Sequence, residues 1–297
     1  MKKQATDRAR GVDRLASEAR LLSSVLPPLL IEAERVAAAV RQGTHGRRRA
    51  GQGESFWQFR RYGTGDAAAR IDWRQSARTD KLFVREREWE AAQSAYLWAD
   101  SSGSMRYASE NNLPQKAERA RLLMLALAHL LLRSGEKPLW CAMEPIAINS
   151  DDALTRAATE PVNDASLPFD FPLPRHAHMV LCSDFLAPPE ELNRLMQRLA
   201  AQHVKGILFH ILDPAEESLP FEGRIEMEGC ENEDPLLLAN AGALRAAYLD
   251  KMTEHKTRLM RLAESAGWFY LRHETAARPE MALLQLFASL SENARSF

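Results

Sequence analysis

The chain has 297 residues, of which 45% are hydrophobic and 27% are charged, a balance that is ordinary for a globular protein and excludes wholesale disorder. Its three cysteines are odd in number and form no CxxC pair, which argues against a disulfide framework. Residues 1–90 carry 19 Lys and Arg against 12 Asp and Glu, whereas residues 91–297 carry 20 against 28, so the net charge of −1 conceals a basic first third and an acidic remainder.

Residues 1–46 are predicted to form a helical N-terminal segment. Leu15, Ala19 and Leu22 keep helical spacing, the pair Pro27-Pro28 interrupts the pattern, and a second helix resumes at residue 29 and runs to residue 40. The charged start of the chain is not followed by the apolar core of a signal peptide, so we expect a cytoplasmic protein.

Residues 47–92 are predicted to form an accessory region rich in arginine and aromatic residues, with a strand over residues 82–90. Acidic residues are interleaved with the arginines, which favours internal Arg–carboxylate pairs in a small β-rich subdomain. Two alternatives are a nucleic-acid surface, since basic and aromatic side chains together bind single strands, and a patch at Arg47, Arg48 and Arg49 for an acidic partner.

Residues 93–297 alternate between short apolar strands and helices. We predict strands at 95–99, 179–183, 206–212 and 268–271, a hairpin over 139–148, a further strand at 224–228, and helices at 114–134, 188–202, 241–266 and 281–290. This order is typical of an α/β fold with a doubly wound, mostly parallel, Rossmann-type sheet covered on both faces. The longest apolar stretch, residues 122–132, is too short to cross a bilayer, so no direct membrane insertion is expected.

A candidate metal site lies at the predicted strand ends, where ligands bind in such sheets. Asp100, Ser102 and Ser104 follow the strand at 95–99 at alternate positions, so their side chains can converge in a tight loop that Gly103 helps to turn. Asp184 follows the strand at 179–183 and adds a second carboxylate, directly or through water. Oxygen ligands with few formal charges suit Mg²⁺ or Mn²⁺. An ordinary turn with Asx and Ser caps would have the same composition.

The chain resembles two families. The pattern D-x-S-x-S at the end of a first strand is the metal-ion-dependent adhesion site of von Willebrand factor A domains. From about residue 45 to the C-terminus the chain is similar to the bacterial domain of unknown function 58 family. The residues that carry this second resemblance are Gly53-Glu54, Phe56, Arg60 to Tyr62, Gly65-Asp66, Arg70 to Trp73, Ser76 to Arg78, Leu82, Val84 to Glu86, Asp100 to Met105, Asp213 to Glu216, Leu219 to Phe221 and Gly223.

The resemblance implies an adaptor that works with a MoxR-type AAA+ ATPase in assembling or activating other proteins. It implies a von Willebrand factor A-like domain over residues 93–297, in which a partner's carboxylate completes the metal shell. Asp184 matches the last aspartate of the adhesion site. The adhesion site usually includes a threonine from a loop between Asp100 and Asp184, for which Thr155 and Thr159 are the candidates in the interval, though neither has the usual Gly-Thr context.

Most enzyme classes lack their motifs in this sequence. There is no phosphate-binding G-x-x-x-x-G-K-[ST] loop, no G-x-S-x-G elbow and no H-E-x-x-H pair. One alternative left open is a Mg²⁺-dependent phosphohydrolase with Asp100 as nucleophile. The position two residues on, which is a general acid in haloacid-dehalogenase-type enzymes, is here Ser102. We therefore expect a binding protein and not an enzyme.

Overall fold

The computed structural model describes residues 14–24, 50–51, 55–61, 76, 82–88, 94–160, 165–168, 173–175, 177–227 and 236–295. It contains two compact units: residues 35–92 form one, and residues 93–297 with those before residue 35 form the other. The predicted boundary between the helical N-terminal segment and the accessory region, at residue 46, lies outside the described residues.

The smaller unit contains an antiparallel sheet of strands in the order β1-β3-β2, with β1 at Ala50–Gly51, β2 at Ser55–Arg61 and β3 at Phe83–Glu88. The β2–β3 register shifts between Phe56 and Gln58, and the Phe83 amide donates a 2.9 Å hydrogen bond to the Ser76 hydroxyl. Residues 47–49 and the arginine side chains of this unit lie outside the described residues. The predicted arginine–carboxylate pairs and the nucleic-acid alternative therefore stay predictions.

The larger unit contains a six-stranded sheet in the order β11-β8-β7-β4-β5-β6. Its strands are β4 (Ser94–Ala99), β5 (Lys137–Trp140), β6 (Ile146–Ala147), β7 (His178–Ser183), β8 (Lys205–Leu212) and β11 (Phe269–Glu274). All neighbouring pairs are parallel except β5–β6, which confirms the predicted mostly parallel α/β sheet. From β4 the chain moves outward to β5 and β6, and from β7 outward the other way to β8 and β11. The pair β4–β7 is therefore the topological switch point.

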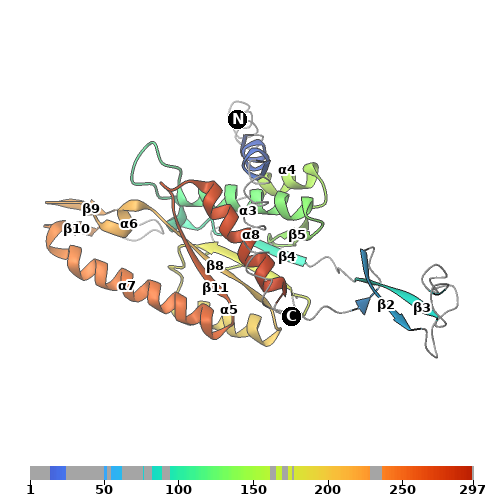
Figure 1. The fold of residues 1–297 in the computed structure, drawn as a ribbon. Helices are drawn as coiled ribbons and strands as arrows, with labels where there is room; N and C mark the ends of the chain where they lie inside the picture. The colour runs from blue at the N-terminus through green and yellow to red at the C-terminus, as the bar shows by residue number, and fades with distance from the viewer. Residues whose placement is uncertain are drawn as a thin grey trace. The chain divides into compact units, whose positions relative to one another are not determined.

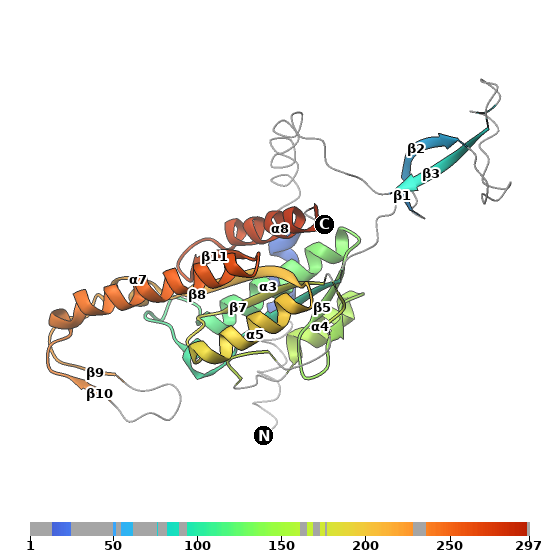
Figure 2. The ribbon, with the colours of Figure 1, turned by 90° about the horizontal axis from the view of Figure 1, so that it is seen from below.

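Helices cover both faces of this sheet (Figures 1 and 2). Along β4, Ala95 and Leu97 belong to one core cluster and Tyr96 and Trp98 to the other, as the twofold alternation of a strand requires. The first cluster contains residues of α3 (Lys116–Arg133), α4 (Asp151–Thr159) and α8 (Pro279–Arg295). The second contains residues of α5 (Pro189–Ala201) and of the C-terminal part of α7 (Ala241–Ser265).

The N-terminal helical residues 14–24 pack into the first cluster. Ala16, Ala19 and Leu22 are buried there among residues of α3 and α8. Ser23 Oγ lies 2.6 Å from Nδ1 of His129, which is on α3, and Arg20 donates to Thr155 Oγ1 on α4. This helix is therefore part of the larger unit, although residues 35–92 separate it in the sequence from the rest of that unit.

The structure contains elements that the sequence pattern did not predict. They are α4, the short helix α6 (Pro214–Ser218), the 3₁₀ turn η2 (Gly103–Arg106) and β10 (Leu236–Leu238), which pairs antiparallel with β9 (Ile225–Met227). Helix α7, which is 25 residues long, follows β10 and runs back from it toward the six-stranded sheet (Figure 1). Among the described residues, no helix is long and apolar enough to span a membrane.

Candidate functional site

Asp100 and Asp184 come together at the switch point, because the ends of β4 and β7 pair directly. Ala99 lies opposite Cys182 in the parallel register, and the Asp100 amide continues the ladder with a 2.8 Å hydrogen bond to the Cys182 carbonyl. Asp100 and Asp184 are both buried. Asp100 and Asp184, which the sequence places at strand ends, therefore lie together at the carboxyl ends of the two central strands.

The loop after β4 brings Ser102 and Ser104 together. Oδ1 of Asp100 accepts a 2.8 Å hydrogen bond from the Ser102 amide, which turns the chain immediately after the strand. The turn η2 follows, and Met105, whose amide donates to the Ser102 carbonyl, is fully buried and anchors the loop in the core. In this conformation the hydroxyl oxygens of Ser102 and Ser104 are 3.3 Å apart.

The second oxygen of Asp100 is held from β7. Ser183 Oγ donates a 2.6 Å hydrogen bond to Asp100 Oδ2 and accepts one from the amide of Phe185. Burial raises the pKa of Asp100 above its usual value, and the bonds from Ser183 and Ser102 oppose that shift while the nearby Asp184 adds to it. The carboxylate is thus oriented by two donors but shielded from bulk water.

Asp184 has a cationic partner of its own. Nζ of Lys116, the first residue of α3, lies 2.8 Å from Asp184 Oδ2, and both side chains are almost wholly buried. The same ammonium lies 2.5 Å from Glu216 Oε1 on α6. Burial lowers the pKa of Lys116, but Asp184 and Glu216 outweigh it and the net direction is upward, so the lysine is charged.

Asp213 completes the cluster at the end of β8. Its Oδ1 accepts from the Ala215 amide and caps α6, and its Oδ2 accepts a 3.0 Å hydrogen bond from the amide of Ser109 in the loop after β4. Glu216 Oε2 accepts from the Asp213 amide. Polar side chains thus tie together the loops that follow β4, β7 and β8.

The donor set of Asp100, Ser102 and Ser104 fits a small hard cation. Oxygen ligands about 2.1 Å from Mg²⁺ at right angles lie about 3 Å apart, close to the separation of the two hydroxyls. Each carboxylate oxygen of Asp100 keeps a further lone pair beside the bond it already accepts. Within the described residues, no group of three His, Cys, Asp or Glu could hold a metal ion, so a cation here would depend on the hydroxyls. The metal assignment stays a prediction.

Thr155 and Thr159, the candidates for the threonine of the site, both lie on α4. Their hydroxyls donate to carbonyls of the same helix, at Asp151 and Arg156. Thr155 also accepts from Arg20. Among the described residues, neither threonine makes a hydrogen bond to the loop 100–104, so the structure brings neither of them into the cluster.

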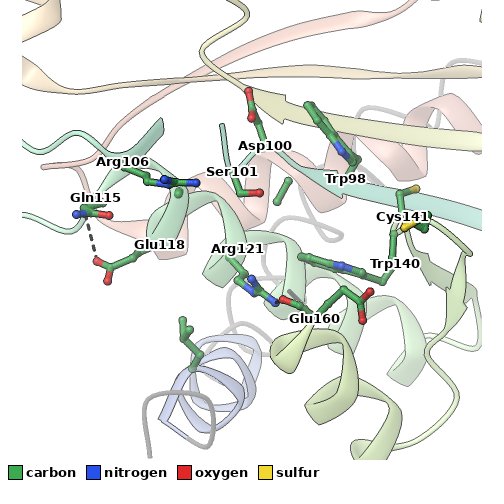
Figure 3. Close-up of a pocket in the computed structure, with 15 residues that line it drawn as sticks. Trp98, Asp100, Ser101, Arg106, Gln115, Glu118, Arg121, Trp140, Cys141 and Glu160 are labelled. Atoms are coloured by element: carbon green, nitrogen blue, oxygen red, sulfur yellow. Dashed lines mark hydrogen bonds between the residues drawn. The ribbon is translucent and has the colours of Figure 1, made fainter. Parts of the chain in front are cut away.

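A pocket of about 430 Å³ lies beside the loop after β4. Figure 3 shows Asp100 and Ser101 at the end of β4, with Arg121 next to the ring of Trp140. The Arg121 guanidinium carbon lies 5.8 Å from the centre of that ring, and its Nη2 donates to the carbonyls of Ala157 and Glu160. The pocket wall therefore combines aromatic surface with arginine, directly beside the candidate site.

Sequence reasoning missed Ser183, Lys116, Glu216 and Asp213. Asp213 follows a strand as Asp100 and Asp184 do, so the same strand-end argument could have found it. A lysine at the first position of a helix is unfavourable beside the positive end of the helix dipole, and that is a signal that Lys116 has an acidic partner. Glu216 belongs to the block Asp213 to Glu216 that carries the family resemblance, but that block does not show its contact with Lys116. No comparable signal exists for Ser183, which is joined to the site by a tertiary contact.

Two solved structures are distantly similar to this chain. The conserved hypothetical protein BatB from Bacteroides thetaiotaomicron has 12% identity and a TM-score of 0.42, with 68% of this chain and 99% of that chain covered. An aerotolerance-related membrane protein from Bacteroides fragilis has 12% identity and a TM-score of 0.37, with coverages of 67% and 99%. The comparison with curated proteins found no match.

Comparison with protein families gives a firm result. The family described as "Protein of unknown function DUF58" matches residues 58–146 and 157–258, which is more than half of the 297 residues. The match spans strands of the smaller unit and most of the six-stranded sheet, including the loop 100–104 and Asp184. The chain therefore belongs to the DUF58 family.

Proposed function

We propose that the chain is a protein-interaction module that works as an adaptor, with the loop 100–104 as its contact point. The loop lies beyond the carboxyl end of β4 at the switch point of the sheet, where ligands of such sheets bind. Both oxygens of Asp100 already accept hydrogen bonds, which hold the carboxylate in one orientation, as a fixed ligand requires. The site thus favours binding over the phosphohydrolase alternative.

The contact would depend on Mg²⁺ or Mn²⁺. The observation that carries this proposal is the convergence of the Ser102 and Ser104 hydroxyls, 3.3 Å apart, beside the oriented carboxylate of Asp100. When bound, the cation would supply a positive centre with open positions, and a glutamate or aspartate of the partner would complete its shell. Because the surroundings are largely buried, such an attraction is less screened than at an open surface.

The pocket beside the loop would receive the residues that flank the partner's carboxylate. Arg106 and Arg121 contribute positive charge to the pocket wall, and Asp100, Glu118 and Glu160 contribute negative charge. Trp140 contributes an aromatic face, and Met143 is an exposed apolar side chain among the lining residues. Arginine, tryptophan and methionine are enriched in protein interfaces. We propose an acidic segment of a protein as the partner, with a MoxR-type AAA+ ATPase in the cytoplasm as the first candidate.

A pulldown tests this function. The whole chain is immobilised and offered a MoxR-type ATPase in Mg²⁺ or in excess chelator. We expect capture in Mg²⁺, loss of capture in chelator, and loss in both conditions for the double variant Ser102→Ala/Ser104→Ala. The matched control is Ser134→Ala/Ser265→Ala, since those hydroxyls donate to carbonyls of their own helices away from the site. Equal capture by the wild type in Mg²⁺ and in chelator would contradict the proposed function.

A further inference from the structure

Lys116 occupies an unusual place for a lysine. Its side chain is fully buried, and it is one of the largest fully buried side chains among the described residues. Nζ lies within hydrogen-bond distance of two carboxylates from different loops, Asp184 after β7 and Glu216 on α6. The Tyr107 ring, whose centre is 6.0 Å from Nζ, lies on another side. A single positive charge therefore lies between the buried carboxylate of Asp184 and the partly buried carboxylate of Glu216.

This arrangement has the form of a cation site that already holds its cation. Two carboxylate oxygens converge on one point, as they do around a divalent ion, but the point is taken by an ammonium group of the chain itself. By contrast, the two oxygens of Asp100 accept bonds from neutral donors, Ser102 and Ser183. The two aspartates at the switch point therefore differ in their partners: Asp184 is paired with a cationic side chain, and Asp100 is not.

We propose that Lys116 is a built-in cation that withholds Asp184 from the metal site, so that Asp100, Ser102 and Ser104 alone from this chain hold the divalent ion. This inference deepens the proposed function and rests on it. A divalent ion beside one carboxylate keeps a net positive charge, whereas a second aspartate would cancel it. The lysine thus preserves the attraction for a partner's carboxylate, which supplies the second negative charge.

The test is a titration of Mn²⁺ alone into the whole chain, with free Mn²⁺ measured by electron paramagnetic resonance. Lys116→Ala frees Asp184 and Glu216 and leaves room for an ion, so Mn²⁺ should bind at least about tenfold more tightly than to the wild type. The matched control is Lys256→Ala, which removes another lysine from a pair with a glutamate, Glu217, and should leave Mn²⁺ affinity unchanged. If Lys116→Ala binds no more tightly than the wild type, the inference is overturned.

A second arm keeps the net charge constant. The double variant Lys116→Met/Asp184→Asn removes both charges of the Lys116–Asp184 pair. Its Mn²⁺ affinity should stay within about threefold of that of the wild type, because no ligand of the ion is lost. A loss as large as that of Asp100→Asn would mean that Asp184 is a ligand and would overturn the inference. This variant leaves no unpaired charge at Asp184, and the carboxylate that loses its cation is Glu216, which is partly exposed to water.

The same titration separates the two proposals. If the wild type takes up no Mn²⁺, the cation-dependent function fails. The lysine inference rests on that function and then fails with it. If the wild type binds Mn²⁺ but Lys116→Ala, or Lys116→Ala/Glu216→Gln where the single variant does not fold, binds no more tightly, the inference alone fails.

Discussion

The hydroxyl of Ser183 donates a 2.6 Å hydrogen bond to Oδ2 of Asp100, and so joins the ends of β7 and β4 across the switch point of the sheet. The bond is wholly buried, and it fixes one oxygen of a carboxylate whose other oxygen orients the loop 100–104. The candidate site is therefore positioned by the central strand pair and not by the loop alone.

Replacing Ser183 tests this positioning. Ser183→Ala removes a donor from a buried carboxylate, so the free energy of unfolding should fall by about 1–3 kcal/mol. Denaturant unfolding measures the change. Ser218→Ala is the control, because that exposed hydroxyl donates only to a carbonyl of its own short helix and its loss should change stability by less than about 0.5 kcal/mol. Equal effects of the two variants would show that the Ser183 bond does not position Asp100.

The free energy of unfolding should fall strongly when the buried ion pair of Lys116 loses only one of its partners. Lys116→Met leaves Asp184 and Glu216 without their cation, and we expect a loss of about 3–5 kcal/mol in the free energy of unfolding. Lys256→Met breaks a pair that is partly exposed to water, and its cost should be about 1 kcal/mol or less. Thermal unfolding in the absence of divalent ions compares the two. A smaller loss for Lys116→Met than for Lys256→Met would contradict the network described here.

The N-terminal helix should be part of the cooperative fold. Ala19 is fully buried against the core, whereas Leu21 is 67% exposed two residues away. Ala19→Asp should destabilise the larger unit by at least about 2 kcal/mol, because it buries an unpaired charge. Leu21→Asp places the same residue type on the exposed face and should change stability by about 0.5 kcal/mol or less. Similar melting temperatures for both variants would show that the helix is not docked.

The stability of the larger unit should fall as the pH is lowered below neutrality. Burial lowers the pKa of His178 and of His273 to about 4. The positive charge of Lys205 adds to the shift of His178, and that of Arg119 adds to the shift of His273. In the unfolded chain these groups take up protons near pH 6.5. Between about pH 6.5 and pH 4 the unfolded state binds more protons, so stability drops as pH falls through this window.

Melting temperatures across that window measure the effect. The double variant His178→Gln/His273→Gln has neither titrating ring, so its melting temperature should fall less steeply with acid than that of the wild type. Identical slopes for the two proteins would show that these histidines do not carry the pH dependence. Other groups that titrate in the window are common to both proteins and cancel in the comparison.

Much of the sheet could be predicted from the sequence because its strands are short apolar runs bounded by polar turns. The runs that end at Asp100 and Asp184 correspond to β4 and β7, and their adjacency follows from the way doubly wound sheets are connected. The convergence of Ser102 and Ser104 is likewise local, since it depends on a five-residue loop. These features needed no knowledge of distant contacts.

The rest of the site could not be predicted, because it depends on groups far apart in the chain. Lys116 and Glu216 are separated by 100 residues, and Ser183 and Asp100 by 83. The docking of residues 14–24 on α3 and α4 has the same character, since the helical spacing of Leu15, Ala19 and Leu22 predicts an apolar face but not its partner. Helix α4 has only nine residues and a single large apolar side chain, Leu154, although Ser150 caps it through the amide of Ala153.

The central claim is that the loop 100–104 holds a divalent cation through its two serine hydroxyls and Asp100. Isothermal titration of Mg²⁺ into the wild type and into Ser102→Ala/Ser104→Ala tests it most directly, with Ser134→Ala/Ser265→Ala as the control. We predict binding of one Mg²⁺ by the wild type and by the control, and none by the Ser102/Ser104 variant. Equal Mg²⁺ binding by all three proteins, or none by the wild type, would contradict the claim.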